Sequence, residues 1–165
     1  MTSGAVAGEA PRFLVDGMLG RLARWLRLLG YDAEYANDVP DSDIVRRARA
    51  EGRIVLTCDT GLARRRALRV LLIRGERVDE QLAQVVAALG LVFDGALTRC
   101  PVCNMLLDDV AREAVRQRVP PYVYGTQRGF RQCPGCGRVY WRGTHWQRIW
   151  AAIERATPAP SAPTG

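Results

Sequence analysis

The sequence lacks several features that define whole classes of protein. It contains no lysine, so all 24 basic residues are arginine, and its single histidine, His145, excludes a catalytic metal site built from several histidines. No apolar run approaches the roughly 18–20 residues that span a bilayer, which excludes a transmembrane protein. Neither a glycine-rich phosphate loop nor a dinucleotide fingerprint is present, so hydrolysis of nucleoside triphosphates is not expected.

The two ends of the 165-residue chain differ in composition from the rest. Residues 1–11 and 157–165 are rich in small residues and proline, which predicts disorder. The first eleven residues have neither a basic start nor a long apolar stretch, so no secretory signal is expected. We therefore expect a cytoplasmic protein with no membrane partner.

The net charge of +7 is concentrated in one stretch of the chain. Residues 112–148 contain eight arginines and a single acidic residue, Glu113, whereas the segments on either side are neutral. Such an asymmetry predicts a polyanionic partner. A solvated basic surface without a partner is the alternative interpretation.

Four of the five cysteines form two Cys-x-x-Cys pairs, Cys100 with Cys103 and Cys133 with Cys136. Four thiolates are the closed tetrahedral set that structural Zn²⁺ prefers, and without secretion a disulfide framework is not expected. A thioredoxin-like redox pair is the alternative, but it needs one pair that opens a helix. The long gap between the pairs predicts strands or a helix of its own. The fifth cysteine, Cys58, follows an apolar run and is expected to be a buried core thiol.

Between residues 12 and 97, apolar strands alternate with helices. Strands are predicted at 12–16, 32–36, 53–57, 70–74 and 91–93, and helices at 19–29, at 41–52, after Gly61, and at 78–89. Strands joined by helices form a parallel sheet that is covered on both faces. The sequence therefore predicts an α/β fold, with a three-layer domain over residues 12–97 and a small zinc ribbon with a C-terminal helix over residues 98–150.

Acidic residues fall where the strands of this sheet should end. Asp16 ends the first strand and Asp59 follows the third, while Asp41 and Asp43 open the second helix. Ligands of parallel sheets collect beyond the carboxyl ends of the strands, so we expect these side chains to converge. Clustered carboxylates need a cation, and oxygen ligands suit Mg²⁺ or Mn²⁺, which activate water and stabilise charge on a phosphate. Helix capping and turn formation are the structural alternatives.

The basic stretch interleaves arginines with aromatic residues, a pattern typical of nucleic-acid binding. Arginines attract phosphates, and exposed aromatic rings stack unpaired bases. Tyr140 and Trp141 adjoin the second cysteine pair, and one of them is expected to pack on the zinc site. The candidate phosphate contacts are Arg21 and Arg24 on the first helix and Arg128, Arg131, Arg138 and Arg142 in the basic stretch.

The segments FLVDGMLGRLARWLRLLGYDAEYA and DSDIVRRARAEGRIVLTCDTGLARR, followed by two CPxC pairs, resemble the Mut-seven C-terminal RNase family. The resemblance spans roughly residues 12–150 and implies a PIN-like nuclease domain followed by a zinc ribbon. It also implies that Asp16, Asp41 and Asp59 bind one or two Mg²⁺ or Mn²⁺ ions, with Asp43 as an auxiliary residue.

The sequence departs from the family pattern at one point. Many PIN nucleases carry a further glutamate on an early helix, and this chain has no clear match for it. Glu34 and Asp38 are possible substitutes, and the number of metal ions stays open.

The resemblance implies a metal-dependent endoribonuclease that hydrolyses RNA phosphodiester bonds, with single-stranded RNA as the expected substrate and the zinc ribbon binding it. The alternative is a non-catalytic RNA-binding protein, or one associated with the ribosome or ribosomal RNA, that retains a PIN-like fold. A PIN-type toxin is a third hypothesis, although a zinc ribbon is unusual in such compact toxins. DNA stays open as a substrate, since nothing in the sequence reads a 2′-hydroxyl.

Overall fold

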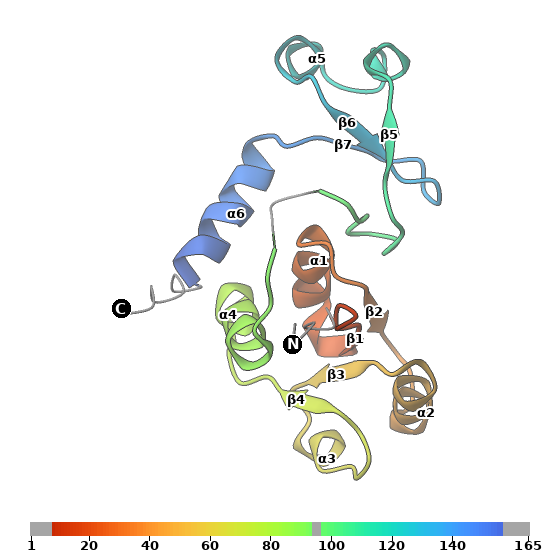
Figure 1. Cartoon of the computed structure of the whole chain (residues 1–165), viewed down its shortest axis with the longest axis vertical. Coiled ribbons are helices and arrows are strands. Elements are labelled where there is room, and N and C mark those ends of the chain that lie inside the picture. The colour runs from red at the N-terminus through yellow and green to blue at the C-terminus, as the bar shows by residue number, and fades with distance from the viewer. Residues whose placement is uncertain (1–7, 94–96, 157–165) are drawn as a thin grey trace, which may run out of the picture.

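The computed structural model describes residues 8–93 and 97–156, which form two units joined by a long helix (Figure 1). We call residues 12–93 the α/β unit. Its elements follow one another as β1 (Phe13–Asp16), the 3-10 turn η1 (Gly17–Leu19), α1 (Gly20–Leu28), β2 (Ala33–Ala36), α2 (Asp41–Glu51), β3 (Ile54–Thr57), α3 (Thr60–Ala63), β4 (Val70–Leu72) and α4 (Val78–Leu89).

The four strands form one parallel sheet in the order β2-β1-β3-β4. In its register, Val15 lies opposite Tyr35 of β2 and Leu56 of β3. Because every connection is a helical crossover, helices cover both faces of the sheet. The predicted α/β fold with a central parallel sheet is confirmed.

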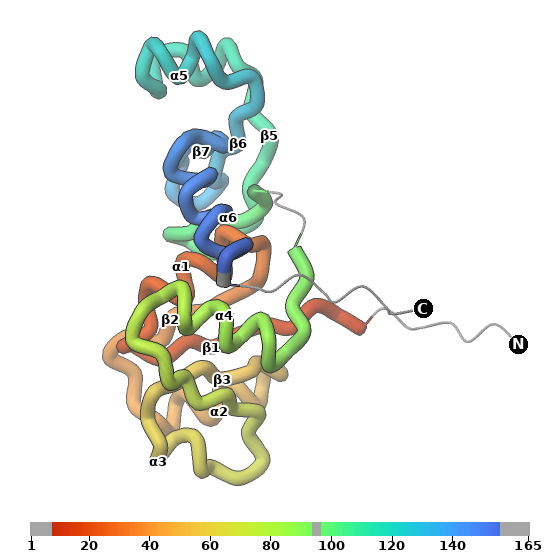
Figure 2. The backbone as a smooth tube through the Cα atoms, turned by 90° about the vertical axis from the view of Figure 1, so that its left-hand side faces the viewer, coloured from red at the N-terminus to blue at the C-terminus, as the bar shows by residue number. Residues whose placement is uncertain are grey.

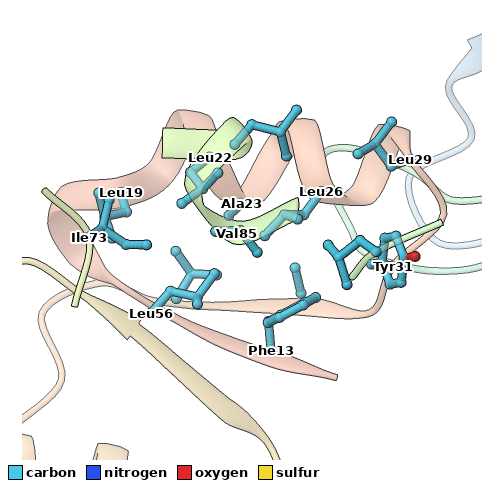
Figure 3. Packing of buried hydrophobic residues seen from close by; sticks show 14 of the residues in the cluster. Phe13, Leu19, Leu22, Ala23, Leu26, Leu29, Tyr31, Leu56, Ile73 and Val85 are labelled. Carbon is cyan, nitrogen blue, oxygen red and sulfur yellow. The ribbon is translucent and has the colours of Figure 1, made fainter. Parts of the chain in front are cut away.

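Alternate residues of β1 belong to two different cores, as the period of a strand requires. Phe13 and Val15 pack with Leu56 beneath the buried face of α1, which carries Leu22 and Leu26 (Figure 3). Leu14 and Val55 face the other way, towards the buried residues Ile44 and Ala48 of α2 and Leu62 of α3. Burial of each large apolar side chain contributes about 1.5–3 kcal/mol.

The ends of the elements differ from the prediction at two places. Pro40 is the N-cap of α2, and Asp41, the first helical residue, makes no capping hydrogen bond through its side chain. Residues 91–93 form no strand. The glycines that follow α2 and α4, Gly52 and Gly90, adopt left-handed backbone angles with φ of 64° and 62°, the conformation that ends many helices.

Residues 97–143, which we call the ribbon, form the second unit. Three strands, β5 (Asp108–Val110), β6 (Phe130–Gln132) and β7 (Val139–Tyr140), make an antiparallel sheet in that order. The 3-10 turn η2 (Arg112–Val115) and α5 (Pro121–Thr126) lie between β5 and β6. The prediction that the segment between the cysteine pairs carries strands or a helix is confirmed, since it carries both.

The last helix, α6 (Thr144–Ala156), returns from the ribbon to the α/β unit and lies beside α4 (Figure 2). Its buried Ile149 and Ile153 belong to the core beneath α1. The predicted end of the ribbon domain at residue 150 therefore falls inside a helix that packs on the other unit.

The predictions of disorder for residues 1–7 and 157–165 fall outside the described residues. Among the helices that the structure describes, none has the length and apolarity needed to cross a membrane.

Candidate active site and nucleic-acid cleft

Two of the predicted acidic residues are hydrogen-bonded to one buried hydroxyl, Asp16 through its carboxylate and Asp59 through its backbone N–H. β1 ends at Asp16, and the adjacent strand β3 ends at Thr57, whose side chain is fully buried. Oγ1 of Thr57 donates a hydrogen bond of 2.8 Å to Oδ2 of Asp16 and accepts one of 2.9 Å from the backbone N–H of Asp59. Thr57 thus fixes the position of both acids at the carboxyl edge of the sheet. The sequence analysis missed this residue, although a threonine at the end of a fully apolar strand is a usable signal.

The carboxylates of this pair also have local structural partners. Oδ1 of Asp16 accepts a hydrogen bond of 2.7 Å from the N–H of Gly17. Oδ1 of Asp59 accepts hydrogen bonds from the N–H groups of Gly61 at 2.7 Å and Leu62 at 3.4 Å, so Asp59 caps α3. These bonds are the turn and cap roles that the sequence left open, and they orient the second oxygen of each carboxylate.

Asp41 and Asp43 lie at the same edge of the sheet. β2 ends at Ala36, opposite Asp16, and α2 begins at Asp41 after a short connection. Asp41 is exposed, whereas Oδ1 of Asp43 forms an ion pair of 2.7 Å with Arg46 on the same helix. The carboxylate of Asp43 is therefore engaged by an arginine of its own helix.

Of the two residues considered as substitutes for the missing glutamate, Glu34 points to α2, where it pairs with Arg47 at 3.5 Å. Asp38 is exposed and adopts a positive φ of 53° in the connection between β2 and α2. A neighbour that the sequence analysis did not single out, Asn37, lies close to Gly17: its Oδ1 would be 3.2 Å from a Cβ at that glycine. Asn37 therefore belongs to the surroundings of Asp16.

The predicted acids do not close into a tight cluster. Among the residues that the structure describes, the four paired cysteines are the only group of three or more potential ligands whose donor atoms all lie within 4.8 Å of one another. The described acids therefore form no closed cage of carboxylates around an ion. Mg²⁺, however, keeps several water ligands and is often held by only one or two carboxylates.

Cys58 lies beside this edge and is exposed, so the prediction of a buried core thiol is wrong. Cys58 is the first residue after β3, and it lies beyond the part of the sheet that the helices cover. Partial burial and the carboxylate of Asp16 raise the pKa of the Cys58 thiol, which keeps it protonated at neutral pH.

The four paired cysteines form a site that is compatible with zinc. The first pair lies in the loop closed by the bridge between Arg99 and Leu106, and the second pair lies between β6 and β7. In each pair a backbone N–H of the second cysteine donates to the sulfur of the first, at 3.3 Å for Cys100 and 3.5 Å for Cys133. Amide groups that point at sulfur stabilise thiolates.

The surroundings of the cysteines favour the same interpretation. A hydrogen bond from the backbone at Arg138 lowers the pKa of Cys136 to about 7, whereas the hydrogen bond with Cys136 raises the pKa of Cys103 to about 12. The hydroxyl of Tyr140 lies 3.1 Å from the sulfur of Cys100. The prediction that one of the two adjoining aromatic residues packs on this site is confirmed for Tyr140.

The first cysteine loop is bound to the α/β unit by buried polar contacts. From α1, Nη1 of Arg27 donates to the carbonyl oxygens of Pro101 at 2.9 Å and Val102 at 3.1 Å. Asn104, which has a left-handed φ of 66°, donates to Asp32 at 2.7 Å and accepts from the N–H of Ala33 at 3.1 Å. The two units are therefore held in a defined relative position.

A cleft of about 840 Å³ opens between α1, the first cysteine loop, β7 and the start of α6. Its described lining includes four arginines and no acidic residue. Three of these, Arg21, Arg24 and Arg138, are predicted phosphate contacts, and the fourth, Arg148, was not among them. Aromatic side chains lie between the arginines: Trp25, Tyr122, Tyr140, Trp141 and Trp146, together with His145.

The other three predicted contacts do not line this cleft. Arg131 forms an ion pair of 3.4 Å with Asp109 across the ribbon sheet, while Arg128 and Arg142 are exposed outside the cleft lining. Position in the basic stretch was therefore a poor guide to which arginines share a surface.

Comparison with protein families supplies the decisive observation. Residues 11–153 match the model of the Mut7-C RNAse domain, which covers most of the chain. The protein belongs to the Mut7-C RNAse domain family. Comparisons with curated proteins and with solved structures found no match. Membership indicates a nuclease-like function with RNA as the substrate class.

In this Mut7-C RNAse domain, a second hollow of about 680 Å³ adjoins the cleft, and its lining includes the acidic residues Glu76 and Asp79. Gly17 and Met18, which follow Asp16, line the second hollow, and it shares Arg21 and Trp25 with the cleft. The family match covers both units and most of α6, so it includes every residue that lines the cleft.

Proposed function

We propose that this Mut7-C RNAse domain is a metal-dependent endoribonuclease that hydrolyses phosphodiester bonds at the edge formed by Asp16 and Asp59. The observation that carries the proposal is the hydrogen-bonded link of both acids to Thr57, at the carboxyl edge of a parallel sheet. Where two carboxylates share one site, a cation offsets their repulsion, and oxygen ligands favour Mg²⁺ or Mn²⁺.

A divalent ion bound there would supply an activated water and would stabilise charge on the scissile phosphate. Asp16 and Asp59 hold it in this proposal, with Asp41 as a further ligand and Asp43 as an auxiliary. Arg21 lies in the first turn of α1, after the 3-10 turn that follows Asp16, and in this proposal it contacts a phosphate of the substrate strand. Attack by water in line with the leaving oxygen yields a product with a 5′-phosphate.

The zinc in this proposal is structural. Four thiolates complete the tetrahedral shell of Zn²⁺ and leave no position for a substrate. We expect the protein to act in the cytoplasm, where cysteines stay reduced and are available to the metal.

The test is cleavage of a labelled single-stranded RNA with Mg²⁺, with Mn²⁺ and with neither ion. Omission of the ion is preferable to a chelator, because a chelator also removes zinc. Asp16→Asn and Asp59→Asn should each reduce the cleavage rate by about a hundredfold or more. Asp109→Asn, which changes an exposed ribbon carboxylate, is the matched control and should cleave normally. Equal cleavage by the wild type and both site variants would overturn the proposal.

The same assay separates the roles of the two acids on α2. Asp41 is exposed at the edge, whereas Asp43 is engaged by Arg46. We therefore expect Asp41→Asn to lower the cleavage rate more than Asp43→Asn does. The reverse order would assign the ligand role to Asp43.

A second candidate function is RNA binding without catalysis, with the ribosome or ribosomal RNA as the partner. The observation that favours it is the absence, among the described carboxylates, of a tight cluster of three. It predicts RNA binding by the purified protein with no cleavage under any of the three ion conditions.

A further inference from the structure

The cleft between the two units combines three properties that single-stranded nucleic acid requires. Four arginines line it without any acidic residue among the described lining, which makes it attractive to phosphates. Tyr122 is 74% exposed although it is a large aromatic side chain, and Trp25 and Trp141 are only partly buried. Exposed rings stack bases only when those bases are not paired in a duplex.

The walls of the cleft are held together by specific contacts between the α/β unit and the ribbon. Its two sides are joined by the bonds from Arg27 to the first cysteine loop and by the bonds of Asn104 to Asp32 and Ala33. Backbone contact is also close, since a side chain at Gly30 would meet Oγ1 of Thr98 at 2.9 Å. α6 closes the third side and is anchored in the α/β core by Ile149 and Ile153.

The direction of α1 gives the cleft an orientation. The helix begins at Gly20, just after the edge that carries Asp16, and ends at Leu28 beside the ribbon. Arg21, Arg24, Trp25 and Leu28 all line the cleft and lie along this one helix. The hollow next to Gly17 shares Arg21 and Trp25 with the cleft, so the lined surface continues along α1 to Gly17, the residue that follows Asp16 in the chain.

We propose that this cleft binds one strand of RNA and leads it along α1 from the ribbon to Asp16. Arg21, Arg24, Arg138 and Arg148 contact successive phosphates, and Tyr122 and Trp25 stack unpaired bases. The identity of the strand as RNA and its destination at Asp16 rest on the proposed function, whereas binding in the cleft is measured separately.

The experiment measures binding of a fluorescent single-stranded RNA of about 12 nucleotides by anisotropy at several salt concentrations. The protein carries Asp16→Asn and Asp59→Asn, so that the probe stays intact. Three further changes are added singly: Arg24→Ala on α1, Arg138→Ala in the ribbon, and Tyr122→Ala on α5. All three side chains are exposed, so their loss leaves the core unchanged. Arg69→Ala is the matched control, because Arg69 is an exposed arginine at the amino end of β4.

Charge and stacking predict different signatures. Arg24→Ala and Arg138→Ala should each weaken binding and lower the slope of log affinity against log salt by about 0.7, the value for one lost phosphate contact on a single strand. Tyr122→Ala should weaken binding about tenfold with the slope unchanged. Arg69→Ala should bind as the parent does, and a duplex of the same sequence should bind at least about tenfold more weakly.

The inference would be overturned if the Arg24 and Arg138 variants bound RNA as tightly as the Arg69 variant. It would also be overturned if the protein bound the duplex as tightly as the single strand. The two proposals fail in different ways. If wild-type protein cleaves RNA and the cleft variants bind and cleave normally, the cleft inference is wrong and the proposed function stands. If the cleft variants lose binding but the wild type cleaves no RNA, the cleft is supported and the proposed function is wrong.

Discussion

Asn104, which follows the first cysteine pair, donates a hydrogen bond of 2.7 Å to the carboxylate of Asp32, which precedes β2. The same carboxylate forms an ion pair of 2.8 Å with the buried guanidinium of Arg53. One acidic side chain thus joins the ribbon to the amino edge of the sheet. At the opposite, carboxyl edge of the sheet, Asp59 is exposed and Asp16 is half-buried.

The first prediction concerns this junction and its dependence on pH. Burial raises the pKa of Asp32, but hydrogen bonds from Arg53 and Asn104 outweigh it, so the pKa lies below its ordinary value of 3.8. A lowered pKa means that the stabilisation is present above 3.8 and is lost as the pH falls through the lower, folded value. Asp32→Asn should therefore lower the free energy of unfolding at neutral pH by about 1–3 kcal/mol.

Urea denaturation of the wild type and Asp32→Asn at pH 7 and in acid checks this expectation. The difference between the two proteins should shrink in acid, where the wild-type carboxylate is also neutral. Asp109→Asn, whose ion pair with Arg131 is exposed, serves as the control and should change little. A difference that stays constant across this pH range would contradict the linkage.

The second prediction concerns the hydroxyl that links the two acids. Thr57→Val keeps the shape of the buried side chain but removes the hydrogen bonds to Asp16 and Asp59. We expect the cleavage rate to fall about tenfold and the Mn²⁺ concentration for half-maximal activity to rise, as for a lost partner of a metal ligand. Thr57→Ser keeps the hydroxyl and should retain most of the activity. Equal losses in both variants would indicate a role in packing alone.

The third prediction concerns the cysteine site. The purified wild-type protein should contain about one zinc ion per chain, and Cys100→Ser should lose it. Because the loop that contains Cys100 also carries the acceptors for Arg27, amide hydrogen exchange should increase across the ribbon while β1 and β3 stay protected. Cys58→Ser is the control, since Cys58 is not in the cluster. Zinc content and ribbon protection that survive in Cys100→Ser would contradict the assignment.

Local sequence signals were sufficient for most of the helices and strands and for the cysteine site, although the strand predicted at residues 91–93 is not formed. The apolar strand 53–57 and the helical spacing of Leu22 and Leu26 are found where expected, because both patterns follow directly from burial on a sheet or on one helix face. The paired cysteines come together because each pair occupies one tight loop. Such features depend on a few neighbouring residues.

Features that depend on packing between distant segments were missed. Arg148 shares the cleft with Arg21 only because α6 folds back on the α/β unit. The helical spacing of Ile149 and Ile153 indicates a buried helix face, but it does not say which unit covers that face. Cys58 follows the four buried residues of β3 but lies past the end of the covered strand, where burial stops abruptly. The order of strands and helices predicts that the acidic residues lie at one edge of the sheet. It does not predict the direction in which each carboxylate points.

The last prediction tests whether α6 is part of the α/β core. Ile153 is fully buried beside residues of α1 and α4, so Ile153→Ala should lower the free energy of unfolding by about 2–5 kcal/mol. Gln147→Ala, an exposed change on the same helix, is the control and should have little effect. Because α6 also forms one wall of the cleft, Ile153→Ala should weaken RNA binding at temperatures just below its unfolding transition, while Gln147→Ala should not. If Ile153→Ala destabilised the protein no more than the control, α6 would be an appendage, and the cleft would lack a fixed third wall.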